Sequence, residues 1–169
     1  MQLVVIRHGI AGDQEKFARK TGLPDTERPL TRRGRKHMKR VAKGLHREVE
    51  SIDVLAASPL VRAAQTAAIV SKEYDDMLVE TVPELAQEVP SVLAKWLRTQ
   101  VDADVVAIVG HEPYLGILVT WLISGLTASH VEIDKGGMCL LDIEGSPGPK
   151  SATLVWALTP DLLEKLAKK

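Results

Sequence analysis

The chain has 169 residues, of which 45% are hydrophobic, and this length predicts a single domain, residues 1–169, built around one core. The 22 basic and 22 acidic residues cancel, so the overall charge provides no general attraction to nucleic acid or to an anionic membrane surface. Arg7 and His8 interrupt the apolar start, and no later apolar run approaches membrane-spanning length, so we expect a cytoplasmic protein.

Six short runs rich in β-branched or other apolar residues are the predicted strands. In chain order they are residues 3–6, 54–57, 77–82, 105–109, 138–143 and 153–157. Helical patterns separate the earlier runs, and this alternation predicts an α/β fold, a three-layer α/β/α sandwich around a mostly parallel sheet. We expect a mixed sheet because the segment from Met138 onward is rich in strands. The Gly-Ser-Pro-Gly-Pro string at 145–149 predicts a hairpin-like loop between the last two strands.

The ends of the predicted helices are marked by capping residues. Thr31 is expected to cap a long helix in which apolar residues recur at helical spacing. Ser58 is expected to cap the helix that follows the second strand. The last helix is expected to begin at Pro160, with Thr159 as its cap, and to end on Lys169, where the helix dipole favours a cation.

Polar clusters follow three of the predicted strands. Arg7 and His8 follow the first strand, Arg62 lies in the first turn of the helix after the second, and His111 follows the fourth. In an open α/β sheet, ligands bind at the carboxyl ends of the strands. We therefore expect these four residues to meet at one edge of the sheet, which we call the active-site mouth.

Two arginines and two histidines in one place indicate phosphate chemistry. Guanidinium groups match phosphoryl oxygens, and helix N-termini add backbone donors. Neighbouring cations disfavour the charged form of an imidazole, so the arginines would keep His8 neutral and nucleophilic at pH 7. His111 could then donate a hydrogen bond to the oxygens of the phosphoryl group.

Four motifs resemble those of the histidine phosphatase, or phosphoglycerate mutase-like, superfamily. They are Arg7-His8-Gly9, Leu30-Thr31-x-x-Gly34, Ser58-Pro59-x-x-Arg62-Ala63-x-Gln65-Thr66 and Gly110-His111, in the family's order. The short chain and the string Asp25-x-x-Arg28-Pro29-Leu30-Thr31 are similar to the small bacterial phosphohistidine phosphatases of the SixA type. The resemblance implies a phosphoglycerate mutase-like fold, a phosphohistidine intermediate on His8 and a phosphate pocket made by Arg7, Arg62 and His111. It also implies that no metal and no other cofactor is needed.

The residue that would protonate the leaving group is harder to find. Larger members of the superfamily carry Leu-x-Glu after the third strand, whereas this chain has Leu85-Ala86-Gln87, and glutamine is no useful proton donor. Four acidic residues remain as candidates, namely Asp25, Glu84, Glu88 and Glu112. Family position favours Asp25 first and Glu84 second, and a structural or solvated role is left open for both.

The sequence disfavours two other phosphatase mechanisms. The Asp102-x-Asp104 string resembles that of the aspartate-nucleophile, magnesium-dependent phosphatases, but here it precedes its strand and so falls at the opposite edge of the sheet. Cys139, the single cysteine, lies in an apolar run, and Gly145 occupies the position where a cysteine-dependent phosphatase needs an arginine. We expect Cys139 to be a core residue, and its lack of a partner agrees with a reducing compartment.

The remaining histidines and many of the basic residues have no such setting. His37, His46 and His130 are interpreted as surface or loop residues. Nine of the 22 basic residues form a run that no acidic residue interrupts: Arg28, Arg32, Arg33, Arg35, Lys36, Lys39, Arg40, Lys43 and Arg47. The run is either the solvated face of an amphipathic helix or a docking surface for an acidic phosphoprotein.

The spacing of the motifs also bears on the substrate. The segment between Arg62 and His111 leaves no room for a large insertion over the site, and an open site suits a phosphoryl group carried by another protein. Phosphohistidine on a protein is therefore the preferred substrate. A small phosphomonoester is the alternative, and a non-catalytic phosphate-binding regulator is the third possibility. Neither nucleic acid nor a membrane is expected as a partner, and the sequence predicts no oligomeric state.

Overall fold

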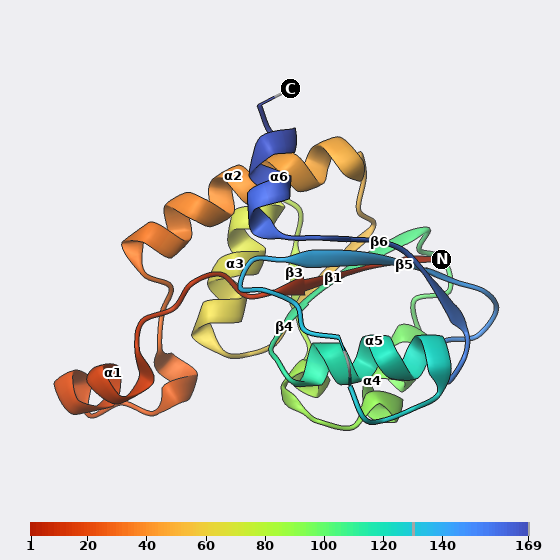
Figure 1. Ribbon diagram of the computed structural model, residues 1–169, viewed down its shortest axis with the longest axis horizontal. Coiled ribbons are helices and arrows are strands. Elements are labelled where there is room, and N and C mark those ends of the chain that lie inside the picture. Colours follow the sequence, from red (N-terminus) through yellow and green to blue (C-terminus); the bar gives the residue numbers. More distant parts are fainter. Residues whose placement is uncertain (130, 169) are drawn as a thin grey trace.

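The computed structural model describes residues 1–129 and 131–168, and its strands form one six-stranded mixed sheet (Figure 1). The strands are β1 (Gln2–Arg7), β2 (Val54–Ala57), β3 (Val79–Thr81), β4 (Val105–Gly110), β5 (Met138–Ile143) and β6 (Ala152–Leu158). Their order across the sheet is β3-β2-β4-β1-β5-β6. The first four strands of this order are parallel, and β5 and β6 are antiparallel to their neighbours. The predicted three-layer, mostly parallel fold is confirmed.

Helices cover both faces of this sheet. The segments are α1 (Gln14–Thr21), η1 (Asp25–Glu27), α2 (Arg32–Glu48), α3 (Val61–Ser71), η2 (Pro83–Ala86), α4 (Pro90–Leu97), α5 (Tyr114–Ser124) and α6 (Pro160–Leu166), where η marks a 3₁₀ helix. Side chains of α2, α3 and α6 share one core with the sheet, and those of α4, α5 and η2 share the other. Among the described residues, none of the helices has both the length and the apolar composition needed to cross a bilayer.

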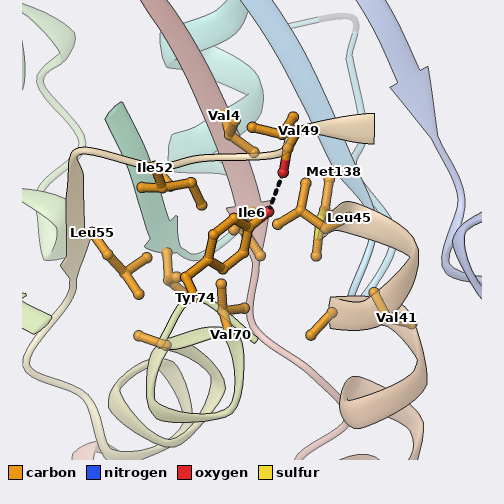
Figure 2. Close-up of a cluster of buried hydrophobic side chains, with 14 of the residues drawn as sticks. Val4, Ile6, Val41, Leu45, Val49, Ile52, Leu55, Val70, Tyr74 and Met138 are labelled. Atoms are coloured by element: carbon orange, nitrogen blue, oxygen red, sulfur yellow. Dashed lines mark hydrogen bonds between the residues drawn. The ribbon is translucent and has the colours of Figure 1, made fainter. Parts of the chain in front are cut away.

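The two cores follow from the alternation of side chains along β1. Val4 and Ile6 point to the layer of α2 and α3, whereas Leu3 and Val5 point to the layer of α4 and α5. Figure 2 shows the first core, in which the hydroxyl of Tyr74 donates a hydrogen bond to the backbone oxygen of Val49 at 2.8 Å. Burial on both faces of the sheet explains why β1 is a continuous apolar run.

Several element boundaries differ from those expected. Ser58 is not a helix cap, since Leu60 occupies the N-cap position of α3 and the Ser58 hydroxyl is engaged elsewhere. The third strand spans Val79–Thr81 and not 77–82, because the turn through Asp75 and Asp76, which have positive φ angles, continues to Met77, whose amide donates to the Tyr74 oxygen at 3.1 Å. The final helix ends at Leu166, and Lys169, like His130, lies outside the described residues.

Helix α1 was not predicted, because it has no buried face. It lies within the connection from β1 to α2, and Figure 1 shows it standing away from the body of the molecule. The Asp13 side chain caps its start and Gly22 ends it in a left-handed conformation. Local capping therefore defines a helix that hydrophobic periodicity cannot reveal.

Candidate active site

The four predicted residues of the active-site mouth lie where neighbouring strands end. Parallel pairing places Arg7 opposite Gly110, and the His8 amide donates to the Gly110 oxygen at 3.0 Å. His8 and His111 are therefore the next residues beyond one rung of the sheet, and their ring centroids are 5.0 Å apart. The side chain of Arg62 reaches the same point from the first turn of α3. The sheet thus brings together residues that the sequence holds far apart.

Hydrogen bonds fix which nitrogen of His8 is free. Nδ1 lies 2.7 Å from the backbone oxygen of Gly9, which can only accept, so Nδ1 carries the proton. Nε2 is left with its lone pair and accepts from Nε of Arg62 at 3.3 Å. Burial lowers the pKa of His8 to about 4; the hydrogen bond to Gly9 opposes this shift, and the charges of Arg62 and Arg7 add to it. His8 is neutral at pH 7 and presents a bare Nε2.

His111 is buried, with only 5% of its surface exposed. Burial lowers its pKa to about 3, and the neighbouring His8 and the charge of Arg62 act in the same direction. Its Nε2 lies 2.8 Å from the hydroxyl oxygen of Ser58. Its Nδ1 is buried and has no hydrogen-bond partner among residues 1–129 and 131–168. The neutral ring therefore keeps one nitrogen that no described protein group satisfies.

Asp25 orients the guanidinium of Arg62. Its carboxylate forms an ion pair with Nη1 of Arg62 at 3.2 Å, and its backbone oxygen accepts from the same atom at 2.9 Å. The second carboxylate oxygen accepts from Nε of Arg28 at 2.6 Å. The hydrogen bond from Arg28, together with the charge of Arg62, lowers the pKa of Asp25 against the effect of burial. The structure thus places Asp25 at the site, but ionised and without a proton to give at neutral pH.

Arg7 is anchored at one end of its guanidinium. Nη1 donates to the backbone oxygen of Ile133 at 2.7 Å, while its buried Nε has no partner. Three buried side-chain nitrogens lack a partner in the described part of the chain, and two of them are Nε of Arg7 and Nδ1 of His111. Buried polar nitrogens without partners are costly. An anion bound here would give Nε of Arg7 an acceptor, and it would do the same for Nδ1 of His111 where that nitrogen carries the proton.

The other acidic candidates are not joined to this cluster. Glu84, on η2, is half-buried and makes no hydrogen bond to His8, Arg62 or His111 within residues 1–129 and 131–168. Glu88 lies with Tyr114, where their hydrogen bond raises the pKa of the tyrosine. Both oxygens of Glu112 accept from backbone amides, Oε1 from residue 133 at 2.9 Å and Oε2 from residue 116 at 3.2 Å. Glu112 therefore ties the segment before β5 to α5.

Three residues that support His8 were not assigned a role from the sequence. The amide of Gly9 donates to Oγ1 of Thr66 at 3.0 Å, and this hydroxyl donates to the backbone oxygen of Arg62 at 2.7 Å. A Cβ on Gly9 would lie 2.4 Å from Cγ of Met38. A Cβ on Gly34 would lie 2.1 Å from the backbone oxygen at position 10. The two glycines let α2 pack directly against the loop that holds His8. The role of Thr66 could have been found from the sequence, because Arg62 and Thr66 are four residues apart and so lie on the same face of α3.

The groups of the disfavoured mechanisms lie away from the mouth. Asp102 and Asp104 precede β4, at the amino end of the sheet. Cys139 is buried, and burial raises the pKa of its thiol to about 12, so it is an inert core residue as predicted. Within the described ranges, no three His, Cys, Asp or Glu side chains are grouped closely enough to hold a metal ion.

Comparisons with known proteins agree with this arrangement. A family model described as the histidine phosphatase superfamily (branch 1) matches residues 3–87. An uncharacterized protein of Picosynechococcus sp. is 32% identical over 141 residues, which cover 82% of each chain.

Among solved structures, the protein histidine phosphatase SixA complexed with tungstate superposes with a TM-score of 0.80 at 24% identity, covering 95% of this chain and 98% of that one. The alpha-ribazole phosphatase from Shigella flexneri gives 0.75 at 22% identity, covering 95% and 97%. A phosphoserine phosphatase from Entamoeba histolytica, in complex with phosphoserine, gives 0.71 at 13% identity, covering 96% and 98%. At these identities the structural likeness shows a shared fold.

Proposed function

Because the chain belongs to the histidine phosphatase superfamily, we propose that it is a phosphatase that carries the phosphoryl group transiently on His8. The family match ends at residue 87, before His111, but β4, β5 and β6 continue the same sheet and β4 leads into the site. We therefore propose residues 1–169 as one histidine phosphatase domain.

The observation that carries the proposal is that Nε2 of His8 has no proton and so keeps its lone pair. Its ring is held by the hydrogen bond from Nδ1 to the Gly9 oxygen, and Nε2 accepts a hydrogen bond from Arg62. In the proposed reaction, a phosphoryl group binds Arg7, Arg62 and His111, and its oxygens take up the donors that now lack partners. Binding draws the guanidinium of Arg62 onto an oxygen and leaves Nε2 facing phosphorus.

The reaction then proceeds in two displacements. In the first, Nε2 of His8 forms a bond to phosphorus and the bond from phosphorus to the substrate breaks. In the second, water attacks phosphorus, the bond to Nε2 breaks and phosphate leaves, with the proton of the water passing to phosphate or to solvent. The arginines balance the charge on the phosphoryl oxygens throughout, so the proposal needs no metal ion.

We further propose that the substrate is phosphohistidine on a protein. Between Arg62 and His111 the chain forms α3, β3, η2, α4 and β4, all of which belong to the sheet or its two helical layers. A site that this part of the chain does not cover with an inserted segment suits a phosphoryl group presented by a second protein. The ionised Asp25 fits as well, because a phosphoimidazole can take a proton from solvent on its other ring nitrogen and leave as neutral imidazole. Such a substrate needs no acid from the enzyme.

The exposed cations of α2 support a protein substrate. Arg32, Arg33, Lys36 and Arg40 line one shallow hollow on the outer side of α2, and this helix begins beside the loop that holds His8. A positive surface next to the mouth would attract an acidic phosphoprotein. A small phosphomonoester remains the second candidate, since two of the structural neighbours are an alpha-ribazole phosphatase and a phosphoserine phosphatase.

The decisive experiment is a rapid-quench labelling of the wild-type protein with a ³²P-labelled phosphohistidine protein and, in parallel, with a panel of small phosphomonoesters. We expect an acid-labile, base-stable label on His8, its absence from His8→Ala, and turnover unchanged by EDTA. The phosphohistidine protein should give the higher kcat/KM. A label on Asp102 or Asp104, or activity lost in EDTA and restored by magnesium, would overturn the mechanism; a far higher kcat/KM for one small ester would overturn the substrate.

A further inference from the structure

Ser58 is fully buried, and within the described part of the chain its side chain forms hydrogen bonds with His111 and with the backbone of its own turn. Its hydroxyl oxygen lies 2.8 Å from Nε2 of His111 and accepts a hydrogen bond from the backbone amide of Leu60 at 3.3 Å. A hydroxyl has one hydrogen to donate. Because the amide of Leu60 uses a lone pair of the oxygen, the hydroxyl hydrogen is available for the ring of His111.

Because His111 is neutral, its hydrogen bond with Ser58 determines which ring nitrogen carries the proton. Burial lowers the pKa of His111 to about 3, so the ring is neutral and has a single N–H at pH 7. If Nε2 accepts from Ser58, that N–H is at Nδ1, the buried nitrogen that has no partner. In the opposite tautomer, Ser58 would receive two donors and its own hydrogen would have no acceptor, while Nδ1 would present a lone pair to the oxygens of a bound anion.

We propose that Ser58 is a positioning residue that holds His111 in the tautomer protonated at Nδ1, so that this N–H is a permanent donor to the phosphoryl group. The inference rests on the proposed function only in naming that group as the acceptor. It gives the two histidines matched tautomers and opposite roles. His8 uses its Nδ1 proton on the backbone and presents a bare nitrogen, whereas His111 uses its bare nitrogen on Ser58 and presents a proton.

The tautomer can be measured directly, without any turnover. In ¹⁵N-histidine-labelled protein at pH 7, the ring nitrogens of His111, assigned by comparison with His111→Asn, should show a proton on Nδ1 and none on Nε2. Ser58→Ala should give a mixture of tautomers or the reversed one. The proposal is overturned if the wild type carries the proton on Nε2, whether or not the protein proves to be a phosphatase, and wild-type spectra alone decide this if the variant does not fold.

Kinetics and phosphate binding provide the second readout. Ser58→Ala should lower kcat toward para-nitrophenyl phosphate by roughly tenfold to a hundredfold, below the roughly hundredfold to thousandfold loss that follows outright removal of one donor to the transition state, because a mixture of tautomers keeps part of the donor. It should also weaken binding of inorganic phosphate, and Ser58→Thr, which keeps the hydroxyl, should restore part of both. Ser71→Ala is the matched control, because it removes a buried hydroxyl of α3 that donates to the backbone at Met77. Equal losses in Ser58→Ala and Ser71→Ala would reduce Ser58 to a stabilising role and contradict the proposal.

Discussion

At the scale of single residues, each side chain of the site is held in place by a hydrogen bond or ion pair to a neighbouring residue. Asp25 holds Arg62, the backbone at residue 133 holds Arg7, and Gly9 holds His8. These contacts leave Nε of Arg7 without a partner among the described residues, and Nε2 of His8 with a hydrogen bond from Arg62 alone. Both carboxylate oxygens of Asp25 are engaged, one by Arg28 and the other by Arg62. Arg7, His8, Asp25, Arg62 and His111 therefore provide oriented cations and neutral imidazole rings, but no protonated carboxylic acid.

The absence of such an acid leads to a prediction about Gln87. This residue is exposed at the end of η2, and η2 packs beside the carboxyl end of β4, where Gly110 leads to His111. Gln87→Glu should raise kcat/KM toward alkyl phosphomonoesters by at least about tenfold, because a poor leaving oxygen needs a proton. It should give little gain toward phosphohistidine, and the two values should be measured on the same preparation.

Gln2→Glu serves as the control for Gln87→Glu. Gln2 is also exposed but lies at the opposite end of β1, so it adds the same charge far from the mouth. If both variants behave alike, or if phosphohistidine gains as much as an alkyl ester, leaving-group protonation does not explain specificity.

The motifs of the sequence predicted which residues meet at the mouth and that His8 is neutral at pH 7, but not the ionisation of Asp25 or the tautomer of His111. The meeting of Arg7, His8, Arg62 and His111 follows from motif order and strand alternation alone. The ionisation of Asp25 depends on Arg28, and the state of His111 depends on Ser58. These contacts are set by side-chain directions in the folded chain, which periodicity and capping rules do not contain.

At the scale of elements, α2 has two different faces. Its buried face uses Gly34 and Gly44 for direct backbone approach, since a Cβ at Gly44 would lie 1.9 Å from the backbone oxygen of Leu163 in α6. Its other face carries the exposed cations, of which Arg40 forms an ion pair with Glu164 at 2.7 Å. The helix itself was predicted from its buried face, and α1 was missed because it has none.

The exposed face of α2 can be tested by reversing its lysines. Lys36→Glu, Lys39→Glu and Lys43→Glu, combined, should lower kcat/KM toward an acidic phosphohistidine protein by about tenfold at low salt and flatten its salt dependence. Turnover of para-nitrophenyl phosphate should hardly change, because a small ester needs no docking surface. Stopped-flow association at several salt concentrations measures the effect.

The matched control reverses three exposed lysines elsewhere, at Lys72, Lys95 and Lys150, for the same change in net charge. These lie after α3, on α4 and in the loop between β5 and β6. A similar loss in the control would assign the effect to net charge, and a similar loss with both substrates would assign it to the pocket itself. Either outcome would contradict the hypothesis that α2 docks the substrate.

At the scale of the whole molecule, burying two neutral histidines links function to acid sensitivity. The pKa of His8 is lowered to about 4 and that of His111 to about 3, whereas both are about 6.5 in an unfolded chain. Between these values the unfolded state binds more protons than the native state, so stability rises with pH. Stability contributed by these residues is complete above about pH 6.5 and is lost progressively as the pH falls toward 4.

Thermal or urea unfolding between pH 7 and pH 5 should therefore show a falling free energy of unfolding. The loss should be on the order of 2 kcal/mol for each buried histidine at pH 5. His8→Asn should reduce the slope, because one of the two titrating groups is gone, whereas His46→Asn, an exposed control, should keep it. A slope that His8→Asn leaves unchanged would mean that His8 titrates normally in the native protein.

The place of β1 in the sheet also has a consequence for synthesis on the ribosome. β1 pairs with β4 on one side and with β5 on the other, so that Gln2 lies opposite both Val105 and Asp142. Both partners are translated long after β1, whose apolar residues 3–6 must wait without a neighbouring strand while most of the chain is made. Such a segment is a natural binding site for a nascent-chain chaperone. The amide of His8 donates to the Gly110 oxygen and its ring lies beside His111, so a chain that ends before β4 contains neither of these neighbours of His8.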